Sequence, residues 1–212
     1  SSNKISKVQN GENYKGINVE TFTLADNAFT PYPVELAKST SKIHYVNLRG
    51  CRINNIPKEA FEGETTKHLV SLDLSYNDLT DLPSSFNAVN LPYFYGLEIS
   101  YNEFSKFPFE PFDCAGLTIY GIRGQRDKNG ERCLSEWPTG VYQHTGLRGL
   151  YIGSNNLGKI EDTISPLIYY LEISDNPNII FDASGVCYEY SIGAYYLIFD
   201  KTQDIRGCSY MR

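Results

Sequence analysis

The chain has 212 residues and a mass of 24.0 kDa, a length that suits one compact domain or one short repeat array. Its 19 Lys and Arg residues stand against 25 Asp and Glu residues, which gives a formal charge of −6. This acidic balance argues against nucleic acid and anionic membrane surfaces as main partners, because both need concentrated positive charge. No apolar stretch approaches the roughly 18 residues that a membrane-spanning helix needs.

Tyrosine and cysteine are the informative residue types. The chain has 17 Tyr residues but only one Trp and one Met. Because tyrosine joins an aromatic ring to a polar hydroxyl, this excess favours a half-exposed recognition surface over a purely apolar core. The five cysteines form no CxxC pair and have no clustered histidines beside them, so we expect neither a metal site nor a cofactor.

Residues 1–18 are polar and punctuated by glycine, and we interpret them as an N-terminal lead-in or cap. The chain begins Ser1-Ser2-Asn3, without an initiator Met or the apolar centre of a leader peptide. We therefore expect that a leader has been removed or that the chain has been shortened.

A repeated pattern follows. The segment Leu69–Pro83 reads LxxLxLxxNxLxxLP, the leucine-rich-repeat signature, and the template fits at seven places. The seven copies, called repeats 1 to 7, begin at Val19, Ile43, Leu69, Phe94, Leu117, Leu147 and Ile168. Repeats 1, 5 and 7 match more weakly, and repeat 5 fits only if 126–132 is an insertion.

The chemistry of the template explains its positions, counted here from the first residue of each repeat. Apolar residues at positions 4 and 6 alternate with polar neighbours, which predicts a short strand that must stack on the next repeat to bury its apolar face. Asn at position 9 can donate and accept, and so satisfy buried backbone groups of the turn. Cys51 and Gln125 replace it in two repeats, and we interpret Cys51 as a buried structural thiol. Phe61, Phe86 and Phe112 are expected to form an aromatic row behind the sheet.

The predicted fold class is an α/β-type repeat solenoid, a curved leucine-rich-repeat horseshoe. Its parallel β-sheet lines the concave face, its convex side is irregular or short helical, and a β cap closes its C-terminus. The solenoid is expected to span 19–181 and the C-terminal cap 182–212, in which the β-prone stretch Ser191–Asp200 pairs with the last repeat.

Two features interrupt this plan. The insertion 126–132 contains an Asn-Gly turn and mixed charges, and we expect a solvated hairpin, not a calcium loop, because most calcium ligands are missing. The sequence leaves two disulfides open. One would join Cys187 to Cys208 around the cap, and the other would join Cys114 to Cys133 around the irregular repeat 5.

The chain resembles leucine-rich-repeat domains of surface or secreted proteins from Bacteroides-type gut bacteria over about Val19 to Arg212. Beyond the repeats, the resemblance rests on two segments, Ile122–Asp127 leading to Glu136-Trp137-Pro138, and Phe199–Cys208. The resemblance implies a bacterial, exported or lipid-anchored protein, extracellular or at the cell surface, and it lends no enzymatic activity. The usual role of such a fold is binding.

The outward positions of the sheet predict the binding surface. Position 5 carries Asp73 and Glu98 on neighbouring strands, where two like charges call for a cation or a basic partner. Tyrosines surround them on the same concave face. The candidate partner-binding residues are Tyr45, Asp73, Tyr76, Tyr95, Glu98, Tyr101, Tyr151, Tyr169 and Glu172.

The sequence indicates a binding module rather than an enzyme. His44, His68 and His144 show no pairing with a nucleophile, and no catalytic motif or phosphate loop occurs. The preferred hypothesis is protein–protein interaction through the tyrosine-rich, mildly acidic face. Carbohydrate recognition on the same face is the alternative. Pairs of coplanar exposed rings with flanking acids or amides would favour a glycan, whereas a broad mixed patch would favour a protein. A structural spacer at the cell surface is a third hypothesis.

Overall fold

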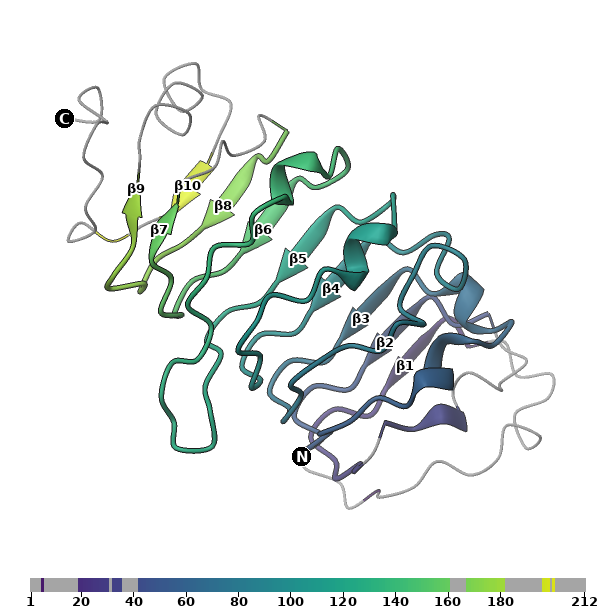
Figure 1. The fold of residues 1–212 in the computed structure, drawn as a ribbon. Coiled ribbons are helices and arrows are strands. Elements are labelled where there is room, and N and C mark those ends of the chain that lie inside the picture. The colour runs from purple at the N-terminus through teal and green to yellow at the C-terminus, as the bar shows by residue number, and fades with distance from the viewer. Residues whose placement is uncertain are drawn as a thin grey trace. The chain divides into compact units, whose positions relative to one another are not determined.

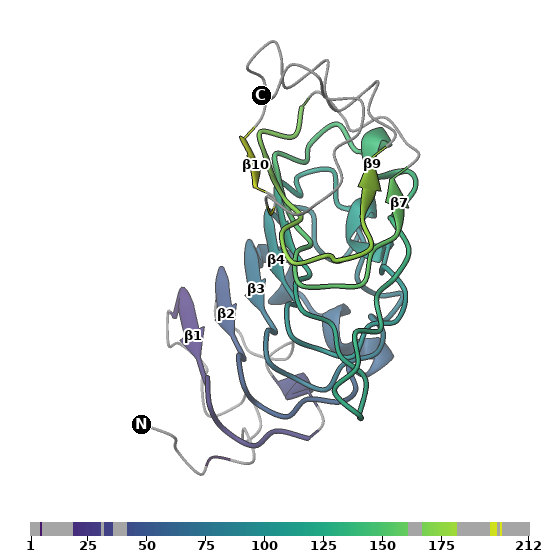
Figure 2. The same ribbon diagram turned by 90° about the vertical axis from the view of Figure 1, so that its left-hand side faces the viewer.

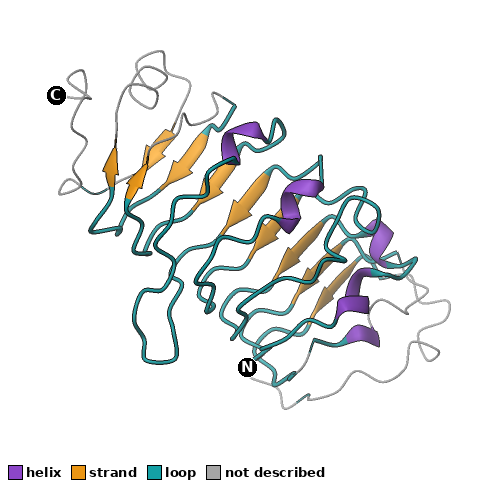
Figure 3. Cartoon of the chain, in the orientation of Figure 1, coloured by secondary structure: helices purple, strands orange, loops and turns teal. Residues whose placement is uncertain are grey.

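The computed structural model describes residue 5 and residues 19–30, 32–35, 42–160, 167–181, 196–198 and 200 (Figure 1). The strands are β1 Thr21–Thr23, β2 Tyr45–Asn47, β3 Ser71–Asp73, β4 Gly96–Glu98, β5 Ile119–Gly121, β6 Gly149–Tyr151, β7 Lys159–Ile160, β8 Tyr170–Glu172, β9 Ile180–Phe181 and β10 Tyr196–Ile198. Short 3-10 helices occur in the connecting segments (Figure 3), and they are η3 Lys58–Phe61, η4 Thr66–His68, η5 Glu110–Asp113 and η6 Val141–Gln143.

The chain forms two compact units, one of residues 1–103 and 108–117 and one of residues 104–107 and 118–212. In the first unit β1, β2, β3 and β4 pair in parallel and in chain order (Figure 2). In the second unit β5, β6, β8 and β10 do the same, and β7 pairs separately with β9. Each unit is therefore a stack of repeats of one solenoid type, as the template predicted.

The core of each repeat lies where positions 4 and 6 place it. Leu72 of β3 is the register partner of Leu97 of β4, and both are buried with Leu74 and Ile99, which follow their strands. In the second unit Leu150 is likewise paired with Leu171 in the sheet register. A strand of three residues has too little apolar surface to be stable alone, so each repeat depends on its neighbours for burial.

The asparagines at position 9 form the predicted ladder. In repeat 3 the Asn77 Oδ1 accepts from the backbone N–H of Cys51 and of Ile53, each at 2.9 Å. Its Nδ2 donates to the carbonyls of Leu48 and Leu74 at 2.9 and 2.8 Å. One amide therefore satisfies backbone groups in two successive repeats.

The two substitutions in the ladder behave differently. Gln125 keeps the role of asparagine, because its Oε1 accepts from the Phe104 N–H at 3.1 Å and its Nε2 donates to the Arg123 carbonyl at 2.9 Å. Cys51 is fully buried, and its thiol donates to the carbonyl of Leu24 at 3.1 Å. Burial raises the pKa of this thiol, which agrees with the predicted structural role.

An aromatic row packs behind the sheet of the first unit. The rings of Phe61 and Phe86 lie 5.0 Å apart, and the row continues on one side to Tyr32 at 5.8 Å and on the other to Phe94 at 5.0 Å. Phe112, the third residue predicted for this row, is only half-buried.

The ends of the chain are described in part. Strand β10 pairs with β8, as the sequence predicted for the stretch 191–200. The rest of the predicted caps, 1–18 and 182–212, lies outside the described residues apart from Ile5 and Asp200. Cys187 and Cys208 also lie outside them. Within the described residues no helix has the length and apolar character needed to cross a membrane.

Asn77→Ala tests the ladder. The change leaves the N–H groups of Cys51 and Ile53 and the Leu48 carbonyl without their partner, whereas the Leu74 carbonyl still accepts from Asn102 Nδ2 at 3.0 Å. Each buried group that loses its partner costs about 1–3 kcal/mol. We expect the free energy of unfolding to fall by roughly 3 kcal/mol or more, measured by urea titration followed by circular dichroism. Asn54→Ala, at an exposed position, is the matched control and should change it by less than about 0.5 kcal/mol. Equal losses in the two variants would contradict the ladder.

The different burial of the cysteines gives a second prediction, which concerns the reactivity of their thiols. Cys51, Cys114 and Cys133 form no disulfide, so the bridge between Cys114 and Cys133 considered from the sequence is absent. Burial raises the pKa of Cys114 to about 12, which disfavours its reactive thiolate at pH 8. Cys133 is only half-buried. Iodoacetamide at pH 8 should therefore modify Cys133 well before Cys51 and Cys114 in the native protein, as followed by peptide mass spectrometry. Reaction of Cys114 at the rate of Cys133 would show that its surroundings open to water.

Candidate binding surface

The predicted site residues are divided between the two units. The first unit carries six of them, which we call the tyrosine surface: Tyr45, Asp73, Tyr76, Tyr95, Glu98 and Tyr101. The second unit carries the other three, Tyr151, Tyr169 and Glu172. The two groups are described separately.

Position 8 of the repeat adopts a left-handed backbone conformation in all seven repeats, with φ between 55° and 66°. The residues at this position are Asp26, Gly50, Tyr76, Tyr101, Gly124, Ser154 and Asp175. The conformation turns the backbone N–H toward the next repeat; that of Tyr76, for example, donates to the Ser100 carbonyl at 2.9 Å. The sequence analysis missed this feature, although glycine and aspartate at position 8 were its signal.

Tyr76 and Tyr101 are the unusual members of this series. A left-handed conformation costs a residue with a bulky side chain about 1–2 kcal/mol, and glycine, aspartate or asparagine tolerate it better. Both tyrosines are nevertheless held there, with φ of 57° and 58°. Their side chains are 45% and 40% exposed, so burial of the rings does not account for the choice of residue.

The two rings stack on one another. Their centroids are 4.3 Å apart and their planes are inclined by 27°. The guanidinium carbon of Arg49 lies 3.9 Å from the centroid of the Tyr76 ring, a cation–π contact. Arg49 belongs to repeat 2 and Tyr101 to repeat 4, so they cover opposite faces of Tyr76 in repeat 3. Tyr76 therefore presents its edge and hydroxyl to solvent.

Asp73 and Glu98 are neighbours, as predicted, because they are register partners on β3 and β4. Their carboxylates also have a local role. Asp73 Oδ1 accepts from the N–H of Ser75 at 2.9 Å, and Glu98 Oε1 accepts from the N–H of Ser100 at 3.0 Å. The same bond from position 7 to position 5 occurs at Asn47 and Glu172. In these repeats the side chain at position 5 thus accepts the backbone N–H two residues later, where the strand ends. The sequence analysis did not recognise this role.

Glu172 corrects the prediction of an accessible acidic residue. It is 7% exposed, and its Oε2 accepts from Arg123 Nε at 2.8 Å and from the Gly153 N–H at 3.3 Å. A Cβ at Gly153 would overlap the Glu172 carboxylate, so glycine makes room for it. The Arg123 guanidinium also lies 4.5 Å from the ring centroid of Tyr151. Glu172 is therefore part of an internal ion pair rather than a free contact group.

Three of the remaining predicted tyrosines are exposed, whereas Tyr151 is half-buried. Tyr45, Tyr95 and Tyr169 are each exposed over nearly half of their surface. A further stacked pair, not among the predicted site residues, joins Tyr170 to Tyr196 of β10 at 5.0 Å with an angle of 12°.

The described part of the chain contains no group of three or more His, Cys, Asp or Glu side chains that could hold a metal ion. The rings of His44 and His68 lie 6.4 Å apart at an angle of 64°, a contact between two aromatic rings.

Substitutions at Tyr76 test the strain. Tyr76→Asn relieves the left-handed conformation but loses a ring stack worth about 0.5–1.5 kcal/mol, so the free energy of unfolding should change by less than about 1 kcal/mol. Tyr76→Val loses the same stack and places a β-branched residue at positive φ, so it should be less stable than the Asn variant by about 1 kcal/mol or more. Urea titrations of the two variants make the comparison, and equal stability would show that position 8 carries no strain.

Comparison with known proteins gives the family. A leucine-rich-repeat family model matches residues 68–88, which include most of repeat 3. Among curated proteins none matches the chain. Two solved structures are similar over nearly its whole length, both leucine-rich-repeat proteins. The one from Bacteroides thetaiotaomicron is 41% identical with a TM-score of 0.88, and the one from Bacteroides eggerthii is 44% identical with a TM-score of 0.86.

The coverage of these matches is unequal. They include 94% and 93% of this chain but only 24% and 33% of the two Bacteroides chains, so this chain spans a third or less of either relative. The Arabidopsis receptor kinase HAESA, solved with a peptide hormone and a co-receptor, is 21% identical with a TM-score of 0.65 over 86% of this chain and 34% of its own. That likeness shows the fold alone. The chain is a leucine-rich-repeat protein that resembles those of Bacteroides.

Proposed function

We propose that the chain is a non-enzymatic binding module that recognises a protein through the tyrosine surface of its first unit. The observation that carries the proposal is the pair Tyr76 and Tyr101. Both residues occupy a left-handed position at which five other repeats have Gly, Asp or Ser, and both stay substantially exposed. Backbone strain retained at an exposed site is typical of residues kept for binding, since folding alone would favour the unstrained alternatives.

The geometry of the rings favours a protein over a glycan. A sugar ring stacks on the open face of an aromatic side chain, and side-by-side coplanar rings provide such a platform. Tyr76 has Tyr101 on one face and Arg49 on the other. Its edge and hydroxyl suit the mixed apolar and hydrogen-bonding contacts of a protein interface, in which tyrosine is enriched.

The charge of the surface indicates a basic partner. Asp73 and Glu98 lie on neighbouring strands beside the stacked tyrosines, and the whole chain has a charge of −6. Acidic groups at an interface attract basic partners and repel acidic ones, which raises association rates and selectivity. Since each carboxylate also accepts a backbone N–H, its position is fixed before the partner arrives.

The family supports the same general function. Leucine-rich-repeat domains generally mediate protein–protein interaction, and HAESA, which shares the fold, was solved with a peptide hormone and a co-receptor. The relatives from Bacteroides support a location outside the cell or at its surface. A domain of this kind would present the tyrosine surface to proteins met outside the cell.

A selection from a random-peptide display library on the immobilised chain tests the proposal. We expect the enriched peptides to contain Lys or Arg together with aromatic residues, and to bind less tightly as the salt concentration rises. The variant Tyr76→Asn/Tyr101→Asn should bind a selected synthetic peptide at least tenfold more weakly in fluorescence-polarisation titrations, a loss of at least about 1.4 kcal/mol.

Tyr93→Asn is the matched control. Tyr93 is 67% exposed and is not one of the six residues of the tyrosine surface, so this variant should bind the peptide like the parent chain. Equal losses in both variants, or none in the double variant, would exclude the tyrosine surface as the binding site. A glycan array that gives signal only with intact tyrosines would favour the carbohydrate alternative instead.

A further inference from the structure

The insertion in repeat 5 forms a compact hairpin. Arg126 and Arg132 pair through an antiparallel bridge at its base. At its tip the Asp127 carboxylate accepts from the N–H groups of Asn129 and Glu131, each at 2.9 Å. These bonds hold the pKa of Asp127 below its usual value. The predicted solvated hairpin is thus observed, and its base carries two arginines.

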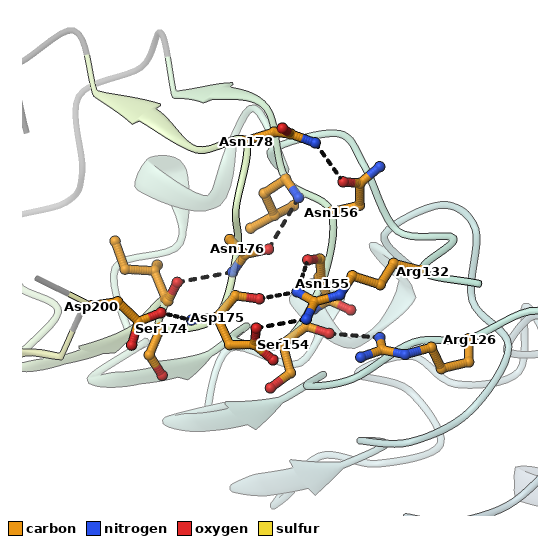
Figure 4. A network of polar contacts seen from close by, with 12 residues as sticks. Arg126, Arg132, Ser154, Asn155, Asn156, Ser174, Asp175, Asn176, Asn178 and Asp200 are labelled. Atoms are coloured by element: carbon orange, nitrogen blue, oxygen red, sulfur yellow. Dashed lines mark hydrogen bonds and ion pairs between the residues drawn. The ribbon is translucent and has the colours of Figure 1, made fainter. Parts of the chain in front are cut away.

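Both arginines reach the turns of later repeats (Figure 4). Arg126 Nη1 donates to the carbonyl of Ser154 at 2.7 Å. Arg132 Nη1 donates to the carbonyls of Asn155, at 2.8 Å, and of Asp175, and its Nη2 lies 2.6 Å from Asp175 Oδ1. The bonds to Ser154 and Asn155 are half-buried, and an ionised donor makes such bonds stronger than neutral ones. The pair with Asp175 is exposed, so solvent screens its charges.

Arg132 links repeats that the solenoid itself does not join. Stacked repeats contact their immediate neighbours, so stability usually passes from one repeat to the next. Arg132 is an insertion residue of repeat 5, yet it contacts repeat 6 at Asn155 and repeat 7 at Asp175. One side chain therefore bridges three successive repeats.

Asp175 continues this link to the terminal strand. In repeats 1, 2, 3, 5 and 6 the N–H at position 8 donates to the position 7 carbonyl of the next repeat. In repeat 7 the N–H of Asp175 donates instead to the side-chain Oδ2 of Asp200, two residues after β10. Asp175 is therefore held by Arg132 through its carboxylate and carbonyl, and by Asp200 through its N–H.

The contacts of Asp175 join Arg132 to the terminal strand. Its carboxylate is paired with Arg132, while its backbone N–H donates to the carboxylate of Asp200. The hydrogen bond from Arg132 holds the pKa of Asp175 below its usual value, so the carboxylate stays ionised and paired. Arg126 adds a second positive charge to the same region.

We propose that the hairpin 126–132 is a strap that fastens the C-terminal repeats, so that the hairpin, repeat 7 and β10 open as one cooperative unit. The strap acts through the chain Arg132, Asp175 and Asp200. It adds a connection across repeats at the end of the described sheet, where β10 would otherwise depend on β8 alone. The proposal is independent of the partner-binding surface, which lies on the first unit.

Hydrogen exchange with mass spectrometry tests the strap in the full chain. The N–H of Ile173 donates to Ile198, and that of Tyr196 to Tyr169, so both amides report the pairing of β8 with β10. Arg132→Gln should make both exchange at least tenfold faster, while peptides covering β2 to β4 keep their rates. Lys128→Gln removes the same charge from the exposed hairpin tip and should change neither amide.

A variant at the other end of the link distinguishes coupling between the hairpin and β10 from a local effect of the substitution. If the strap and β10 open together, Asp200→Ala should also speed exchange of the Asp127 amide in the hairpin, because energetic coupling acts in both directions. Faster exchange at β10 without any change in the hairpin would overturn the proposal, as would normal exchange at Ile173 and Tyr196 in Arg132→Gln. If Arg132→Gln does not fold, the Asp200→Ala result decides.

Discussion

The structure depends on how each repeat turns after its strand. A strand of three residues cannot supply its own stability, and the backbone that leaves it enters the interior, where unpaired polar groups are costly. Two devices at adjacent positions solve this problem. The left-handed residue at position 8 aims its N–H at the next repeat, and the amide at position 9 satisfies the groups on either side, as Asn77 does for Leu48, Cys51, Ile53 and Leu74. Stacking then buries positions 4 and 6.

This dependence explains what could be predicted from the sequence. The period locates the core and the ladder because both repeat, so Leu72, Leu97 and Asn77 were assigned from pattern alone. Glu172 was assigned wrongly for the same reason. Alternation correctly placed it on the outer face, but its partner Arg123 lies 49 residues away, and no repeating pattern records such a contact. Side-chain pairs between distant repeats are set by packing, which only the structure shows.

Residues at position 5 have a structural role in the turn, and two of them also belong to the proposed binding surface. In four repeats the residue at position 5 accepts the N–H of position 7, so an acceptor there serves the fold, although repeat 5 forms its strand with Gly121 at this position; the four residues are Asn47, Asp73, Glu98 and Glu172. An asparagine supplies that acceptor without charge, as repeat 2 demonstrates. The use of carboxylates on the neighbouring strands β3 and β4 therefore adds repulsion that the turn does not require. That excess, rather than the presence of polar residues, is the reason for which we propose a basic partner.

In a repetitive protein, departures from the repeat carry most of the information about individual roles. Tyrosine at position 8 is unfavourable for the turn, and it occurs in two adjacent repeats whose rings then stack. The hairpin interrupts repeat 5, yet its arginines reach repeats 6 and 7. The two departures lie in different units and act differently: the tyrosines accept backbone strain and remain exposed, whereas the hairpin adds hydrogen bonds between repeats. Backbone strain at exposed residues is typical of a binding surface. The last repeat of a stack has a neighbour on one side only, and the contacts of the hairpin compensate for the missing neighbour.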